Sequence, residues 1–61
     1  STASIKKAKE LLEKLIKEKS EIAVADAKDQ WLVSRKFAVP LLEYFDDIGF
    51  TRREGSVRRL K

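Results

Sequence analysis

The chain lacks the residue types on which most enzymes and metal sites depend. Its 61 residues contain no cysteine, no histidine and no methionine. Without cysteine there is no disulfide framework and no thiolate ligand, and without histidine the commonest metal ligand and general base are missing. We therefore expect no catalytic residue, no metal site and no cofactor, and we interpret the chain as a binding domain rather than an enzyme.

Long apolar runs are also absent. No stretch approaches the roughly 18 apolar residues of a membrane-spanning helix, and no signal-peptide pattern is present. The sequence therefore predicts a cytoplasmic domain that does not contact a membrane. Because its length suits one small core and it has no initiating methionine, we expect residues 1–61 to be a single domain of a longer protein.

Charge is unevenly distributed along the chain. The net charge is +4, but residues 1–49 hold nine basic and nine acidic side chains and are neutral overall. Residues 50–61 hold five basic side chains against Glu54 alone, so the whole excess lies at this end. Such a concentrated basic segment is typical of a surface that meets phosphate.

Apolar spacing predicts the first half of the fold. Residues 4–19 repeat apolar side chains at a period near 3.6, which predicts a helix with one buried face. Residues 21–24 follow a break and are expected to form a short strand beside a C-terminal hairpin. Val24, Ala27 and Trp31 stand at i, i+3 and i+7, so a short helix is predicted over 24–31.

In the second half of the chain, individual residues mark more clearly where each element begins and ends. Ser34 is a suitable N-cap and Gly49 a suitable left-handed end, so a helix is predicted over 34–48. Its expected core stripe consists of Phe37, Leu41, Leu42, Phe45 and Ile48. Residues 50–60 then form two short extended runs around a glycine turn, which predicts a hairpin.

The order of these elements is that of a winged helix, in which a helix-turn-helix is followed by a β-hairpin wing. The predicted fold class is thus mostly α with a small antiparallel sheet (α+β). Three amphipathic helices bury their stripes against one another, and the hairpin covers the open side with Phe50, Val57 and Leu60.

Basic residues fall at the two places where a winged helix meets nucleic acid. The start of the helix over 34–48 offers free N–H groups and a favourable dipole, and arginine on the wing suits phosphate. The candidate site comprises Arg35, Lys36, Arg52, Arg53, Arg58, Arg59 and Lys61. An alternative is that the wing arginines only prevent strand-to-strand aggregation, but this leaves the pair at the helix start unexplained.

Other polar and aromatic residues are weaker candidates. Trp31 is interpreted as a core residue, and Tyr44 either stacks on a base or caps the core. The acidic cluster of Glu43, Asp46 and Asp47 is interpreted as solvated surface that repels phosphate from that end of the helix.

The run SRKFAVPLLEYFDDIGFTRREGSVRRL, residues 34–60, resembles the last winged-helix domain of the bacterial selenocysteine-specific elongation factors, the SelB family. The resemblance extends more weakly through EIAVADAKD to Glu21, while Trp31-Leu32-Val33 replaces an expected glycine-containing turn. It implies a parent translation GTPase whose winged helices bind the selenocysteine insertion sequence (SECIS), a hairpin in messenger RNA. The implied contacts are the helix start and the wing, at Ser34, Arg35, Lys36, Arg52, Arg53, Arg58 and Arg59.

We therefore expect a monomeric RNA-binding domain that docks this messenger hairpin beside the preceding winged-helix domains of its parent. Two alternatives are a winged helix that binds duplex DNA and a protein-interaction module with an acidic partner. Glu43, Asp46 and Asp47 argue against insertion of their helix into a DNA groove. Arginine at both expected nucleic-acid contacts argues against a pure protein module.

Overall fold

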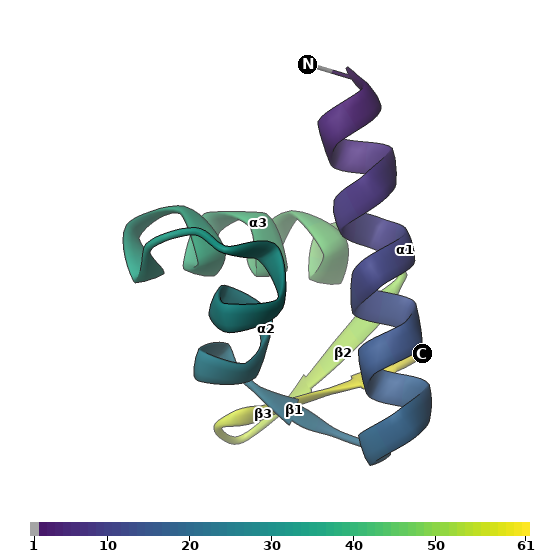
Figure 1. Ribbon diagram of the computed structural model, residues 1–61. Helices are drawn as coiled ribbons and strands as arrows, with labels where there is room; N and C mark the ends of the chain where they lie inside the picture. Colours follow the sequence, from purple (N-terminus) through teal and green to yellow (C-terminus); the bar gives the residue numbers. More distant parts are fainter. Residues whose placement is uncertain (1) are drawn as a thin grey trace.

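The computed structural model describes the backbone of residues 2–61 and the side chains of residues 5–61. Within this range the chain folds into three helices and three strands (Figure 1). The elements are α1 (Thr2–Lys19), β1 (Ile22–Ala23), α2 (Val24–Trp31), α3 (Arg35–Asp47), β2 (Thr51–Glu54) and β3 (Val57–Leu60). The predicted fold class, a helix-turn-helix with a hairpin wing, is confirmed.

The sheet joins the middle of the chain to its C-terminal end. Its strand order is β1-β3-β2 and both pairings are antiparallel, with Ile22 opposite Arg58 and Thr51 opposite Leu60. The strand expected before the second helix is therefore present beside the hairpin, although it is shorter than predicted. β3 is the central strand, and none of its four residues is fully exposed, whereas on β2 only Thr51 is buried.

Phe45 on α3 lies at the centre of the core. Its ring approaches those of Trp31, Tyr44 and Phe50, with centroid distances of 6.1, 5.4 and 5.7 Å. The buried cluster around it consists of Ala8, Leu12, Ile16, Ile22, Ala27, Leu42 and Phe45. All three hairpin residues expected over the core are half-buried; Phe50 and Leu60 pack against this cluster, whereas Val57 does not belong to the packed set and stands opposite Glu54.

Trp31 connects α2 to α1 through a hydrogen bond. Its indole Nε1 donates a hydrogen bond of 2.9 Å to the backbone carbonyl of Ala8 on α1. The ring packs against the core, so its interpretation as a core residue is confirmed. Figure 1 shows the first turns of α1 projecting past α3, and Ile5 there is 45% exposed although it continues the stripe of Ala8 and Leu12.

The predicted stripe of α3 is wrong at both ends. Leu42 and Phe45 are buried, but Phe37 and Ile48 are 68% and 51% exposed, and Ala38 is buried instead. The helix therefore turns the face centred on Ala38, Leu42 and Phe45 toward the core. Phe37 and Ile48 lie on its flank, which a pattern of spacings three and four does not separate from the buried face.

The two ends of α3 differ in how well the sequence predicts them. Gly49 has φ +78, and its N–H donates to the carbonyl of Asp46 at 3.1 Å, so the predicted left-handed end is confirmed. Ser34 precedes the helix, but its hydroxyl makes no capping hydrogen bond. Its backbone carbonyl instead accepts from Phe37 and Ala38, both at 3.0 Å. The expectation of a side-chain cap is therefore wrong.

Candidate nucleic-acid interface

The start of α3 is an exposed basic corner. Ser34, Arg35, Lys36 and Phe37 are all exposed to solvent. Within residues 5–61, neither Arg35 nor Lys36 has a carboxylate within ion-pair distance. Their two positive charges are therefore not neutralised locally and are directed to solvent beside the positive end of the helix dipole.

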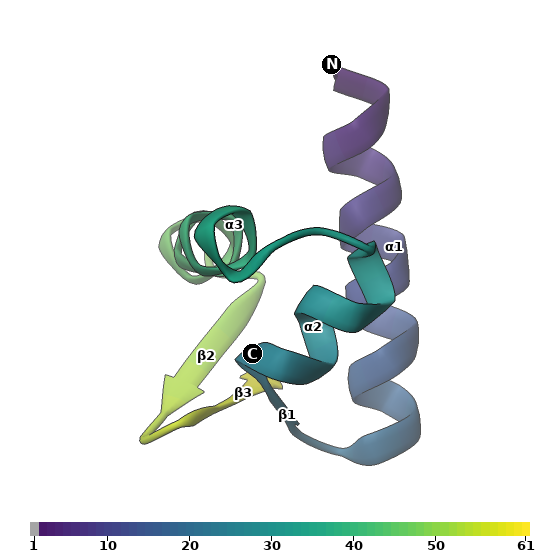
Figure 2. The same cartoon turned by 60° about the vertical axis from the view of Figure 1, so that its left-hand side comes forward.

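The wing lies on the same side of the molecule as this corner. In Figures 1 and 2 the start of α3 and the turn between β2 and β3 both lie on the side opposite α1. The helix-turn-helix and the hairpin thus present the two parts of the candidate site in roughly one direction.

The outer face of the wing carries a ladder of ion pairs. Glu54 accepts from Arg52 and from Arg59, each at 2.7 Å, and Arg59 also pairs with Glu21 beside β1. The register places Arg52 directly opposite Arg59, so one carboxylate lies against two neighbouring cations. The Arg52 and Arg59 side chains remain 56% and 40% exposed, which leaves both guanidinium groups accessible to a further anion.

Arg53 and Lys61 occupy different ends of the hairpin. Arg53 is exposed next to the wing turn, where its Nε donates to the carbonyl of Gly55 at 3.1 Å. The backbone N–H of Lys61 donates to the carbonyl of Phe50 at 3.2 Å, where the hairpin leaves α3. Lys61 therefore lies at the far end from the wing turn, and the structure does not bring it together with the other site residues.

Arg58, predicted from the sequence as a candidate site residue, is not a surface residue. It is only 4% exposed, and its Nη2 and Nε donate to Asp46 Oδ2 on α3 at 3.0 and 3.3 Å. The other carboxylate oxygen of Asp46 accepts from the Thr51 hydroxyl at 2.6 Å. Arg58 thus joins the central strand to α3.

The same contacts correct the interpretation of the acidic cluster. Asp46 is 21% exposed at its side chain and both of its oxygens are occupied, whereas Glu43 and Asp47 are exposed. For the wing, strand alternation was a partial signal, because it separates Arg58 from Arg59 without saying which of the two faces the core. Arg58 lies two residues before the core residue Leu60 and so shares its face, while Arg59 points the other way.

An unusual leucine precedes the corner. Leu32 ends α2 in the left-handed region, with φ 58 and ψ 44, and it is 90% exposed. The N–H groups of Leu32 and Val33 donate to the carbonyls of Asp29 and Lys28 at 3.3 and 3.2 Å, which is the hydrogen-bond pattern that usually places glycine at this position. A leucine there carries strain of about 1–2 kcal/mol, and its exposed side chain gains little from burial.

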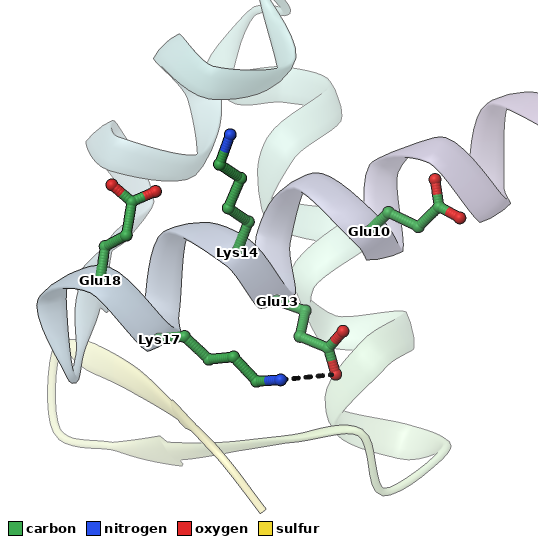
Figure 3. A pocket seen from close by; sticks show the side chains of 5 residues that line it. All are labelled: Glu10, Glu13, Lys14, Lys17 and Glu18. Atoms are coloured by element: carbon green, nitrogen blue, oxygen red, sulfur yellow. Dashed lines mark ion pairs between the residues drawn. The ribbon is translucent and has the colours of Figure 1, made fainter.

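The solvent face of α1 carries both acidic and basic side chains. Figure 3 shows the side chains that line a shallow hollow over this helix, namely Glu10, Glu13, Lys14, Lys17 and Glu18. Three of them are acidic and two are basic, and Lys17 Nζ lies 4.0 Å from Glu13 Oε2. Mixed charge on one exposed helix face is typical of a solvated surface.

Two further features are absent from the described residues. No group of three or more carboxylate, histidine or cysteine side chains there is arranged to hold a metal ion. No helix among them has the length and apolar character needed to cross a membrane.

Comparison with known proteins identifies the family. A family model described as "Elongation factor SelB, winged helix" matches residues 14–60. The chain belongs to the SelB winged-helix family. The SelB match begins inside α1 and ends at Leu60, so it includes α2, α3, the sheet and every candidate site residue except Lys61.

Two full-length SelB proteins are similar to the chain. The selenocysteine-specific elongation factor of Escherichia coli is 43% identical over 51 residues, and that of Haemophilus influenzae is 39% identical over 46 residues. These alignments cover 84% and 75% of this chain but only 8% and 7% of the two relatives. The chain thus contains a winged-helix domain of the SelB type and spans less than a tenth of the length of these two relatives.

Proposed function

We propose that this domain binds the selenocysteine insertion hairpin of a messenger RNA on behalf of a parent selenocysteine-specific elongation factor. The observation that carries the proposal is that Arg35 and Lys36, at the start of α3, have no carboxylate within ion-pair distance among residues 5–61, and that this helix start lies on the same side of the fold as the turn of the wing. Membership of the SelB family supports it. We define the basic surface as Ser34, Arg35, Lys36, Arg52, Arg53 and Arg59.

The charge on α3 favours a hairpin end over a duplex groove. Beyond its first turn the exposed residues of α3 include Glu43 and Asp47, which repel a phosphate backbone laid along the helix. The deep major groove of A-form RNA also excludes a helix, whereas loops present unpaired bases and accessible phosphates. Contact through the start of α3 and the wing therefore suits the apical part of a hairpin better than duplex DNA.

The parent protein supplies the remaining partners in this proposal. The chain spans less than a tenth of the length of its SelB relatives, so preceding winged-helix domains are expected to lie beside it in the parent. The domain acts as a monomer on one hairpin. Because the hairpin belongs to a message that is being translated, the proposed place of action is the cytoplasm.

The test is RNA binding by this chain across a salt series. The ligands are a selenocysteine insertion hairpin, a scrambled hairpin and a DNA duplex, each labelled with a fluorophore and titrated by anisotropy. The variants are Arg35→Ala/Lys36→Ala and Arg52→Ala/Arg53→Ala, and the matched control is Lys14→Ala/Lys17→Ala on α1, which removes the same charge. Preference for the insertion hairpin, with each surface pair lowering the salt slope by roughly 1–2 units, is expected.

Two outcomes would contradict the proposal. Equal, weak binding to all three ligands would reduce the basic surface to a generic charged patch. A loss of affinity in the α1 control as large as in the two surface pairs would show that net charge, rather than this surface, governs binding.

A further inference from the structure

The two most exposed large apolar side chains among residues 5–61 flank the cations at the start of α3. Leu32 is 90% exposed and Phe37 is 68% exposed, and Arg35 and Lys36 lie between them in the sequence. Exposed apolar side chains scattered singly need no explanation. Here two lie within six residues, and one of them is held in a left-handed conformation that favours glycine.

Phe37 differs from the other exposed aromatic residue of α3. Tyr44 is 44% exposed, but its ring makes an edge contact with Phe45, and its sequence neighbour Glu43 is acidic. Phe37 is not among the aromatic pairs of the described residues, and its preceding neighbours are both cationic. A phosphate held by Lys36 would bring a nucleotide beside the ring of Phe37, whereas Tyr44 lies where phosphate is repelled.

The mixture of charge and aromatic surface favours a nucleic acid over a protein as occupant. Cores of protein–protein interfaces are depleted in charged residues. Surfaces that bind single-stranded nucleic acid instead combine a positive track with aromatic rings on which bases stack. Arg35, Lys36 and Phe37 provide both within one turn of helix.

We propose that Phe37 is a stacking platform for one unpaired base of the bound hairpin, with Leu32 as an apolar edge beside it. This inference rests on the proposed RNA binding and adds the class of contact that the basic residues cannot make. Phosphate contacts hold the backbone without regard to sequence, whereas an unpaired base on Phe37 requires a loop or bulge at that position. The ring therefore makes the domain selective for hairpins with an accessible base.

The test compares two equivalent substitutions on one helix. Phe37→Leu and Tyr44→Leu each replace a partly exposed aromatic ring on α3 by an aliphatic side chain, seven residues apart. We expect Phe37→Leu to weaken binding of the insertion hairpin about tenfold, within the range measured for base stacking, and Phe37→Trp to restore it. Tyr44→Leu should bind as the unmodified chain does, and thermal unfolding should verify that both variants fold.

The salt slope separates stacking from charge. Because Phe37 carries no charge, Phe37→Leu should lower affinity at every salt concentration without changing the slope, whereas Arg35→Ala should lower the slope by about 1 unit. Hairpins with an abasic nucleotide at each loop position complete the test. One abasic hairpin should lose affinity for the unmodified chain but lose nothing further with Phe37→Leu, because both changes remove the same contact.

The failures of the two proposals are distinguishable. If the unmodified chain prefers the insertion hairpin while Phe37→Leu binds it equally well, the stacking platform is refuted and the RNA-binding function stands. If the unmodified chain shows no preference for any hairpin, both fail. If Phe37→Leu and every abasic substitution act additively, Phe37 does not contact a base.

Discussion

The pair between Asp46 and Arg58 allows a sharp test of what holds the wing to α3. Its two members are unequally buried, at 21% and 5% side-chain exposure. The Asp46 carboxylate has a second partner in the Thr51 hydroxyl, whereas Asp46 is the only carboxylate that Arg58 contacts among residues 5–61. Removing one partner should therefore not cost the same as removing the other.

The expected costs follow from what each substitution leaves behind. Asp46→Asn leaves a guanidinium that stays charged and nearly enclosed, so we expect a loss of about 3 kcal/mol, the lower end for a broken buried pair. Arg58→Met fills similar space and leaves a carboxylate with a hydrogen bond and some access to water, so a loss of about 1–2 kcal/mol is expected. The double variant should lose less than the sum, with a coupling of about 1–3 kcal/mol.

The assay is thermal and urea unfolding followed by the fluorescence of Trp31, the single tryptophan, whose ring packs against the core. A chain of 61 residues has an unfolding free energy of about 3–9 kcal/mol, so the variants are readily resolved. At roughly 4–8 °C per kcal/mol, Arg58→Met should lower Tm by about 4–16 °C and Asp46→Asn by about 12–24 °C.

The reasoning would be refuted by the reverse order, in which Arg58→Met costs more than Asp46→Asn, or by simple additivity in the double variant. RNA binding gives an independent check. Since the Arg58 guanidinium faces α3 rather than solvent, folded Arg58→Met should keep the salt slope of the unmodified chain. A slope reduced by about 1 unit would return Arg58 to the binding surface.

Two further substitutions test the wing and the turn. Glu54→Gln should raise affinity for the insertion hairpin by about fivefold, because it removes a carboxylate charge 2.7 Å from both Arg52 and Arg59. Glu18→Gln on α1 removes the same charge and serves as the control. Equal affinity of the two variants for the hairpin would contradict the expectation. Leu32→Gly should stabilise the fold by about 0.5–1 kcal/mol, because relief of left-handed strain exceeds the added freedom of the unfolded chain. Thermal unfolding measures it, and a lower Tm would show that Leu32 makes a stabilising contact.

The elements of the fold could be predicted because local signals and periodicity agree with the packing. Ala8, Leu12 and Ile16 recur on one face of α1 and are all buried, and Gly49 has the positive φ that its position suggests. Prediction failed where the core covers only part of an apolar stripe. Phe37 has the spacing of a core residue, but only the tertiary arrangement places it on the flank of α3.

The candidate site was harder to predict because charge alone does not report burial. Arg58 and Arg59 are adjacent and chemically identical, yet one is enclosed against Asp46 and the other stands in the outer ladder with Glu54. The strand period places them on opposite faces, but it does not say which face meets the core until a partner such as Asp46 is located. That partner is twelve residues away and on another element.

The distribution of carboxylates divides the basic surface into two parts with different roles. On the wing, Glu54 and Glu21 lie against Arg52 and Arg59, so the field of these arginines is partly cancelled before a ligand arrives. At the start of α3, Arg35 and Lys36 are not compensated, although their formal charge is smaller than that of the wing. Because attraction at a distance depends on net local charge, the start of α3 should govern the association rate. In the proposed RNA complex, the wing arginines should act at contact, where phosphate would compete with Glu54 for the same guanidinium groups, and should govern dissociation.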